Sequence, residues 1–222
     1  MTSGKRTVDL SHRIYDDMPS YPWTPVPSVS EWVTREQSGE FLAPGVSFHI
    51  AQINMAGNSG SYLNAPFQFH IDGPDVASLP LEWLIDIPVV VVEAPDRQEI
   101  GPDVFEGYDD LAGKAVLIRT GHDRLWGTKD FFRNSPYLTV DAVKHLIAAE
   151  PRIVGIDSQN LDNGKDQSKP AQNGLLGANI LVMVSLTHLD QLPERGSALT
   201  VLPPPIAGMG SFPIRAVAVV DA

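Results

Sequence analysis

The chain has 222 residues, a formal net charge of −11 and a sequence pI of about 4.8. This acidity argues against a nucleic-acid backbone or an anionic membrane as a partner, and the lack of cysteine excludes disulfides and thiolate metal sites. The length predicts a single domain spanning residues 1–222. No apolar stretch is long enough for a signal core or a membrane span, so the expected location is cytoplasmic.

The first part of the chain predicts short strands. Residues 7–24 favour a strand followed by a turn region fixed by prolines. Residues 28–56 alternate loosely between apolar and polar side chains, which indicates two strands joined by a polar loop around residues 37–39. His49 falls in the second of these strands, where a lone histidine is more often a structural hydrogen-bonding residue than a catalyst.

Polar side chains recur at every second position in the glycine-punctuated run of residues 53–73. Those that share one parity are Asn58, Tyr62, Asn64, Gln68 and His70. Successive residues of a strand point to opposite faces. If part of the run is extended, these amides, the phenol and the imidazole form one wall.

The rest of the chain alternates buried strands with short helices. Residues 75–85 and 102–112 predict short helical segments, and residues 139–150 predict the clearest helix, with Thr139 as its cap and Val140, Val143, Leu146 and Ile147 as its apolar stripe. His145 falls off that stripe and is expected to face solvent. Buried strands are predicted at 87–93, 114–120 and 153–157, in the second half of 175–184, and at 216–220.

This order of elements predicts a mixed α/β domain with a central barrel-like or twisted sheet. The third buried strand ends in a polar cluster, residues 157–162, at its carboxyl end.

The spacing of the non-polar residues in the run 53–73 resembles the signature of the cyclase family, His-x-Gly-Thr-His-x-Asp-Ala-Pro-x-His-Phe. Gly60, Ala65, Pro66 and Phe69 are kept, and Ser61 stands for the threonine. Segments such as Val-Leu-Ile-Arg-Thr-Gly and Leu-Leu-Gly-Ala-Asn-Ile follow in the family's order. The family includes bacterial kynurenine formamidase and isatin hydrolase. The resemblance implies a swivelling β/β/α fold, assembled as a homodimer or homotetramer.

The residues that hold a divalent metal in the family are replaced. Asn58, Tyr62, Asn64 and Gln68 occupy the first-half ligand positions, and the second-half ligands align with Gln172 and Val184. Zinc and manganese sites are built from imidazole, carboxylate or thiolate. We therefore expect no metal and no other cofactor.

Two interpretations of this replacement remain open. Either the site has decayed, or it has been converted to metal-independent chemistry. In the second case Tyr62 acts as general acid or oxyanion donor and His70 as base, with Asn64 and Gln68 completing the catalytic group. Asn58 and Gln172 orient polar groups of the substrate, and Ser61 donates a hydrogen bond to it. By the resemblance, Tyr21 and Trp23 lie over the substrate, although both are equally suited to packing of the N-terminal loop.

The function predicted is that of a metal-independent cyclase-family enzyme. It closes a ring in, or eliminates water from, a small polyketide-like molecule in natural-product biosynthesis. One alternative is a metal-independent hydrolase of a lactone, lactam or formamide. The other is a non-catalytic small-molecule binding protein.

Overall fold

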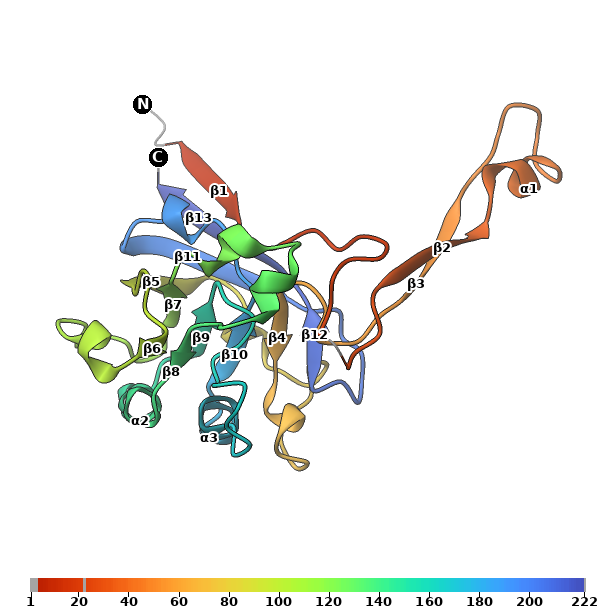
Figure 1. The fold of residues 1–222 in the computed structure, drawn as a ribbon. Coiled ribbons are helices and arrows are strands. Elements are labelled where there is room, and N and C mark those ends of the chain that lie inside the picture. Colours follow the sequence, from red (N-terminus) through yellow and green to blue (C-terminus); the bar gives the residue numbers. More distant parts are fainter. Residues whose placement is uncertain (1–3, 22, 222) are drawn as a thin grey trace.

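The computed structural model describes residues 4–21 and 23–221, and its centre is a nine-stranded sheet (Figure 1). Four neighbouring strands of this sheet run parallel. They are β5 (Ile87–Glu93), β7 (Ala115–Arg119), β9 (Ile153–Ile156) and β10 (Leu181–Val184). All four were predicted as buried strands, because a strand covered on both faces is a continuous apolar, β-branched run.

Antiparallel strands extend the sheet at both edges. Beyond β5 lie β11 (Arg195–Leu202), β13 (Arg215–Asp221) and β1 (Lys5–Asp9), and beyond β10 lie β4 (Tyr62–Asn64) and β12 (Ser211–Pro213). A separate pair is formed by β6 (Glu99–Ile100) and β8 (Tyr137–Leu138). The sheet is curled, so that it forms half a barrel (Figure 1).

Alternate residues of the parallel strands enter two different cores. Val89 and Val91 pack in a cluster on one side of the sheet, with residues of β1, β11 and β13. Val90 and Val92 pack on the other side with α2 (Val140–Ala149) and α3 (Pro170–Gly177). The period of two along a strand explains this division. The predicted mixed α/β fold with a central sheet and flanking helices is confirmed.

The helix α2 begins as the sequence predicts. The Thr139 side chain accepts a hydrogen bond from the backbone N–H of Ala142 at 3.2 Å, which satisfies one of the free donors of the first turn. Leu146 is buried and His145 is exposed, as expected. Val140 was expected to pack inward, but it is 49% exposed because it belongs to the first turn, beyond the edge of the core.

The helical segments predicted at 75–85 and 102–112 are single 3₁₀ turns, Leu81–Trp83 and Pro102–Phe105. Further 3₁₀ turns are Pro66–Gln68, His122–Leu125, Lys129–Phe132 and Leu189–Gln191. The sequence did not predict β11. Its inward positions include Ser197 beside Leu199 and Val201, and the serine weakens the apolar alternation.

The strands β2 (Ser28–Val33) and β3 (Ile50–Asn54) pair only with each other and project away from the sheet (Figure 1). We call residues 26–54 the arm. The two strands predicted within residues 28–56 are confirmed, but all of β3 and nearly all of β2 are exposed. His49 lies just before β3, and its imidazole is 3.3 Å from the Glu31 carboxylate.

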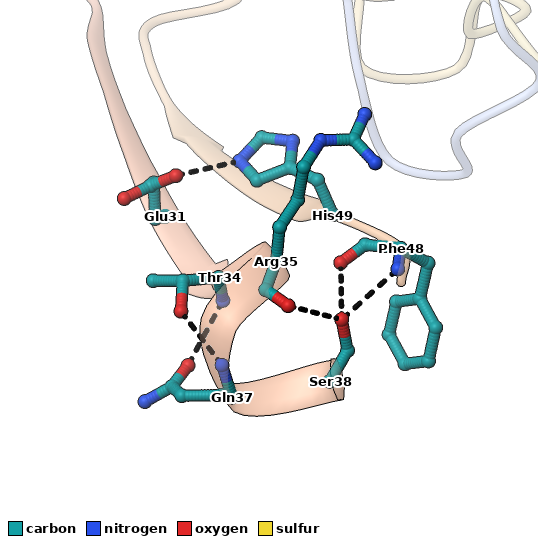
Figure 2. Close-up of polar contacts among 7 residues, drawn as sticks. All are labelled: Glu31, Thr34, Arg35, Gln37, Ser38, Phe48 and His49. Carbon is teal, nitrogen blue, oxygen red and sulfur yellow. Dashed lines mark hydrogen bonds and ion pairs between the residues drawn. The ribbon is translucent and has the colours of Figure 1, made fainter. Parts of the chain in front are cut away.

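The tip of the arm is held by its own polar contacts (Figure 2). A short helix, α1 (Arg35–Gly39), replaces the predicted loop, and Thr34 and Gln37 cap it reciprocally. The Ser38 hydroxyl is fully buried. It donates to the Phe48 carbonyl at 2.8 Å and accepts from the Phe48 N–H at 2.9 Å, which ties the helix to the returning chain.

Within the part of the chain that the structure describes, no helix is both long and apolar enough to cross a bilayer.

Candidate functional site

A cavity of about 420 Å³ lies where β4 and the Pro66–Gln68 turn face α3 and the segment that follows β9. Most of the residues predicted for the site line it. These are Tyr21, Trp23, Asn58, Tyr62, Asn64, Gln68 and Gln172. They come from three separate parts of the chain, so the fold brings together what the sequence only suggests.

The strand β4 sets one wall of the cavity. Tyr62 and Asn64 are two positions apart and share a face, whereas Leu63 between them points into the core on the other side of the sheet. In the sheet Tyr62 lies opposite Val184 of β10, and Asn64 lies opposite Val182. Tyr62 and Val184, which the resemblance places at two of the family's ligand positions, are therefore direct neighbours in space.

Tyr62 is 4% exposed, and burial raises the pKa of its phenol well above the ordinary value. The nearby Tyr21 phenol raises it further. Burial has this effect because it disfavours the charged phenolate. At neutral pH the Tyr62 hydroxyl therefore keeps its proton and can donate it.

Asn64 is 1% exposed, and its side-chain nitrogen is buried without a hydrogen-bond partner. The side-chain oxygen of Gln159, which also lines the cavity, is buried and unpaired as well. A buried polar group without a partner costs about 1–3 kcal/mol. The cavity thus presents one free donor and one free acceptor, which suits a ligand that carries a polar group.

A second wall follows β9 and was not assigned from the sequence. The Asn160 side-chain oxygen accepts from Gln172 Nε2 at 2.6 Å, and its nitrogen donates to the Tyr21 hydroxyl at 3.4 Å. Asn160 therefore links the N-terminal segment to α3. The polar cluster at residues 157–162 was the signal for this wall, since open α/β sheets bind ligands beyond the carboxyl ends of their strands.

Asp162 is the carboxylate of this second wall. Its oxygens accept from the backbone N–H groups of Ala171 at 2.7 Å and Gln172 at 3.0 Å, at the start of α3. It is 3% exposed, and burial raises the pKa of its carboxyl although these two hydrogen bonds act in the opposite direction. Lys169, which also lines the cavity, stabilises the charged form.

Two predicted site residues do not line the cavity. Ser61 is 1% exposed and lies on the opposite face of the chain, where its hydroxyl accepts from the His12 N–H at 2.9 Å and donates to the Ser185 carbonyl at 2.5 Å. These contacts hold the N-terminal segment against β10. Ser61 is thus placed to support the fold and not to contact a substrate in this cavity.

His70 is held against α3, where a ring nitrogen lies 3.0 Å from the Asn173 carbonyl. A Cβ at Gly177 would lie 3.0 Å from the same ring, so helix and imidazole are in close contact. The expectation that His70 shares a wall with Tyr62 is corrected, because the Pro66–Gln68 turn ends the alternation of the strand. Gln68, inside that turn, still lines the cavity.

Two further histidines, His12 and His188, are also outside the cavity. His12 stacks on Trp126 with ring centroids 3.9 Å apart, and burial lowers its pKa to about 4, so it is neutral at pH 7. The imidazole of His188 contacts the Asp9 carbonyl at 2.8 Å.

A family described as "Putative cyclase" matches residues 8–163 of the chain. The chain belongs to the cyclase family. It is 28% identical over 211 residues to a kynurenine formamidase of Geobacillus thermodenitrificans, with 94% of this chain and 95% of that protein covered. A kynurenine formamidase of Bacillus cereus is 24% identical over 212 residues, covering 95% of each.

Solved structures of the cyclase fold superpose on the chain. Isatin hydrolase A from Labrenzia aggregata, bound to benzyl benzoate, matches with a TM-score of 0.85 and 24% identity, covering 98% of this chain and 94% of that one. A predicted metal-dependent hydrolase from Bacillus stearothermophilus matches with a TM-score of 0.77 and 20% identity, covering 97% and 98%. At these identities the likeness establishes the fold.

The cavity residues do not fit a divalent metal, although the Bacillus stearothermophilus protein of this fold is described as a predicted metal-dependent hydrolase. None of the chain's six histidines, all within the described residues, lines the cavity, and Asp162 is its one carboxylate. Across the described residues, no three histidine, aspartate or glutamate side chains are grouped closely enough to hold an ion. Amides and a protonated phenol are poor ligands for zinc or manganese.

Proposed function

We propose that the cavity binds a small aromatic carbonyl compound and promotes its ring closure, or its loss of water, without a divalent metal. The observation that carries this proposal is the buried, unpaired nitrogen of Asn64 on the same strand face as the protonated phenol of Tyr62. Two preorganised donors that converge on one oxygen stabilise the negative charge that develops there in a transition state.

Intramolecular conjugate addition illustrates the chemistry. A substrate hydroxyl forms a C–O bond to the far carbon of a C=C bond conjugated with a carbonyl. The electron pair of the C=C bond shifts to form a new double bond between the α-carbon and the carbonyl carbon, and the carbonyl π pair moves onto the oxygen, to which Tyr62 and Asn64 donate hydrogen bonds. Asp162 accepts the hydroxyl proton, which is then delivered to the α-carbon. The raised pKa of the Asp162 carboxyl suits it to this proton transfer.

The lining indicates the substrate class. Tyr21, Trp23 and Phe69 provide aromatic surface, and the indole of Trp23 is 78% exposed at the rim. The remaining groups are mainly amides, which hydrogen-bond neutral oxygen and nitrogen atoms. A cavity of about 420 Å³ is within the range that encloses such molecules. We therefore assign a flat, largely uncharged aromatic substrate.

A second candidate is metal-independent hydrolysis of a lactone, lactam or formamide. The names of the relatives, kynurenine formamidase and isatin hydrolase, favour it. Tyr62 and Asn64 would then stabilise the tetrahedral oxyanion. Without a metal, however, Asp162 alone would have to activate the water, which makes this reaction more demanding than ring closure.

A probe of each class tests the proposal. The native chain, treated with EDTA, is incubated with 2′-hydroxychalcone, which closes to a flavanone by conjugate addition, and separately with isatin, a lactam. We expect closure faster than in buffer. Tyr62→Phe should lower the rate by about 100-fold or more, since one oxyanion donor is lost. Tyr15→Phe, at an exposed site, is the matched control and should leave the rate unchanged.

Each other result has a definite reading. Hydrolysis of isatin without closure of the chalcone would replace ring closure with the hydrolase function. Saturable quenching of tryptophan fluorescence by either probe, with no turnover, would indicate a non-catalytic binding protein. Equal rates for the native chain and Tyr62→Phe would remove the phenol from the mechanism.

A further inference from the structure

A second cavity, of about 360 Å³, adjoins the candidate site and has no part in the chemistry proposed above. The two cavities share Gln159, Asp162 and Gly164, which belong to the segment that follows β9. A third cavity, of about 230 Å³, shares Gln98 and Asn134 with the second. The three cavities therefore form one row that begins at the candidate site.

This row follows the carboxyl ends of three parallel strands. Residues from the segments after β5, β7 and β9 line it, and these strands are neighbours in the sheet (Figure 1). Open α/β sheets bind their ligands beyond the carboxyl ends of the strands. A ligand that starts in the candidate site can therefore continue along the same edge of the sheet into the other two cavities.

The second cavity is lined mainly by amide and hydroxyl groups. The Ser135 hydroxyl and the Gln159 side-chain oxygen are buried and have no hydrogen-bond partner among the described residues. The Gln159 nitrogen donates to the Phe132 carbonyl at 3.3 Å, so the free atom is the oxygen, which can only accept. A hydrocarbon chain in this cavity would leave both groups unpaired. A chain that carries amide N–H groups would satisfy them.

Positive charge gathers at the far end of the row. Among the described residues that line the second and third cavities, Lys165, Arg97 and Arg124 are cationic, and Asp96 and Asp162 are acidic. The chain as a whole has a formal net charge of −11. A local excess of cations on an acidic protein attracts an anionic group to that place.

The two arginines of the third cavity keep donors free for such a group. Arg97 donates to the Asp103 carboxylate at 2.5 Å, and the Arg124 guanidinium lies 3.8 Å from Asp96 in a pair whose side chains are 69% and 83% exposed. Exposed pairs of this kind contribute little, and each guanidinium has five N–H donors. The arginines come from different segments, after β5 and after β7, so each can donate to a different oxygen of one phosphate.

We propose that the natural ligand of the candidate site is an aromatic acyl group on an amide-containing chain that ends in a phosphate. The flat, uncharged aromatic part occupies the candidate site. The chain passes Ser135 and Gln159 in the second cavity, and the phosphate binds to Arg97 and Arg124 in the third. This inference rests on the proposed function and extends its substrate beyond the first cavity.

Isothermal titration calorimetry with the full chain tests this inference. The probe is S-cinnamoyl-4′-phosphopantetheine, in which an amide-containing chain joins an aromatic acyl group to a phosphate. Its cinnamoyl group has no hydroxyl that could add to the double bond, so binding is measured without ring closure. S-cinnamoyl-pantetheine, which lacks the phosphate, and inorganic phosphate are the comparison ligands. We expect the phosphorylated probe to bind at least about 10-fold more tightly than either, because it gains charge-assisted hydrogen bonds to the arginines.

Three variants locate the parts of the ligand. Arg97→Gln and Arg124→Gln should each remove most of the advantage of the phosphorylated probe and leave the affinity for S-cinnamoyl-pantetheine unchanged. Ser135→Met narrows the second cavity and should weaken the binding of both cinnamoyl probes. Arg215→Gln removes an equally exposed arginine on β13, away from the row, and is the matched control. Circular dichroism establishes that each variant is folded.

Equal affinities for the two cinnamoyl probes would overturn the inference, because the phosphate would then have no site. Inorganic phosphate that binds as tightly as the phosphorylated probe would overturn it as well, because the chain and the aromatic part would add nothing. Ring closure of 2′-hydroxychalcone, which carries neither chain nor phosphate, is measured separately. Either proposal can therefore fail while the other holds.

Discussion

At the scale of single residues, Asn64 is the residue on which the proposal of a ligand-binding cavity depends most. A side chain that served only to fill space would be apolar, as Val184 is, because an unpaired buried amide destabilises the fold. The protein has the amide at this position although the amide destabilises the fold. The same reasoning applies to the unpaired oxygen of Gln159 on the other wall.

This view predicts opposite effects of one substitution on stability and activity. Asn64→Leu keeps the branched arrangement of side-chain heavy atoms and removes the unpaired donor, so the free energy of unfolding should stay the same or rise by up to about 2 kcal/mol. Turnover of the ring-closure probe should fall by about 100-fold. Thermal unfolding and initial rates measure the two effects, and Asn173→Leu, on the exposed side of α3, is the control.

A loss of several kcal/mol in Asn64→Leu would show that the amide supports the fold and not the ligand. Site decay would be the better interpretation if the variant gained stability while the native chain neither bound nor converted any probe.

At the scale of elements, Asp157 joins the ends of two parallel strands. Its carboxylate accepts from the N–H groups of Thr120 and Gly121 at 2.8 and 2.7 Å, and from the Thr120 hydroxyl at 2.5 Å. It is 1% exposed, and burial raises its pKa from 3.8 to about 6 despite these bonds. The end of β9 is thereby fixed to the end of β7, next to the segment that forms the second cavity wall.

This raised pKa predicts a pH dependence of stability. The unfolded chain releases the Asp157 proton near pH 4, and the folded chain holds it to about pH 6. The stabilisation that protonated Asp157 adds to the folded chain is therefore fully present below pH 4 and is lost as the pH rises through 6. Its magnitude is at most about 3 kcal/mol. Urea unfolding measures the free energy of unfolding of the native chain minus that of Asp157→Asn. This difference should be larger at pH 4.5 than at pH 7.

Asp141→Asn, an exposed carboxylate on α2, should show no such change. A stability difference for Asp157→Asn that is constant between these pH values would contradict the raised pKa.

The sequence predicts elements well where a local pattern is sufficient. The four valines of β5 and the Thr139 cap of α2 each specify their element without help from distant residues. The arm shows the limit of such patterns. Its alternation correctly predicts strands, but alternation does not say whether an apolar face is covered by the same chain.

In the candidate site as well, local patterns predict some features and not others. Tyr62 and Asn64 could be placed on one wall because strand geometry fixes their relative direction. His70 could not, because the Pro66–Gln68 turn changes the direction of the chain after Ala65. Asn160 and Asp162 contact α3, and this pairing depends on how β9 and α3 pack, which no short-range pattern specifies.

At the scale of the whole molecule, the chain keeps the fold of its family, and the resemblance predicts that its metal-ligand positions have changed in character. The chain superposes on the structure of isatin hydrolase A from Labrenzia aggregata with a TM-score of 0.85. Five of the six residues that the resemblance places at metal-ligand positions line one cavity as amides and a phenol, and the sixth, Val184, does not line it. We therefore predict that catalysis by this protein relies on placement, hydrogen bonding and proton transfer.

The central claim is that the cavity works without a divalent ion. Elemental analysis of the purified full chain by inductively coupled plasma mass spectrometry tests it most directly. The chain is first dialysed against buffer without chelator. We predict far less than one zinc, manganese, iron, cobalt or nickel ion per chain, and an unchanged rate of ring closure when these ions are added. About one such ion per chain, retained through dialysis and lost together with activity on treatment with a chelator, would contradict the account.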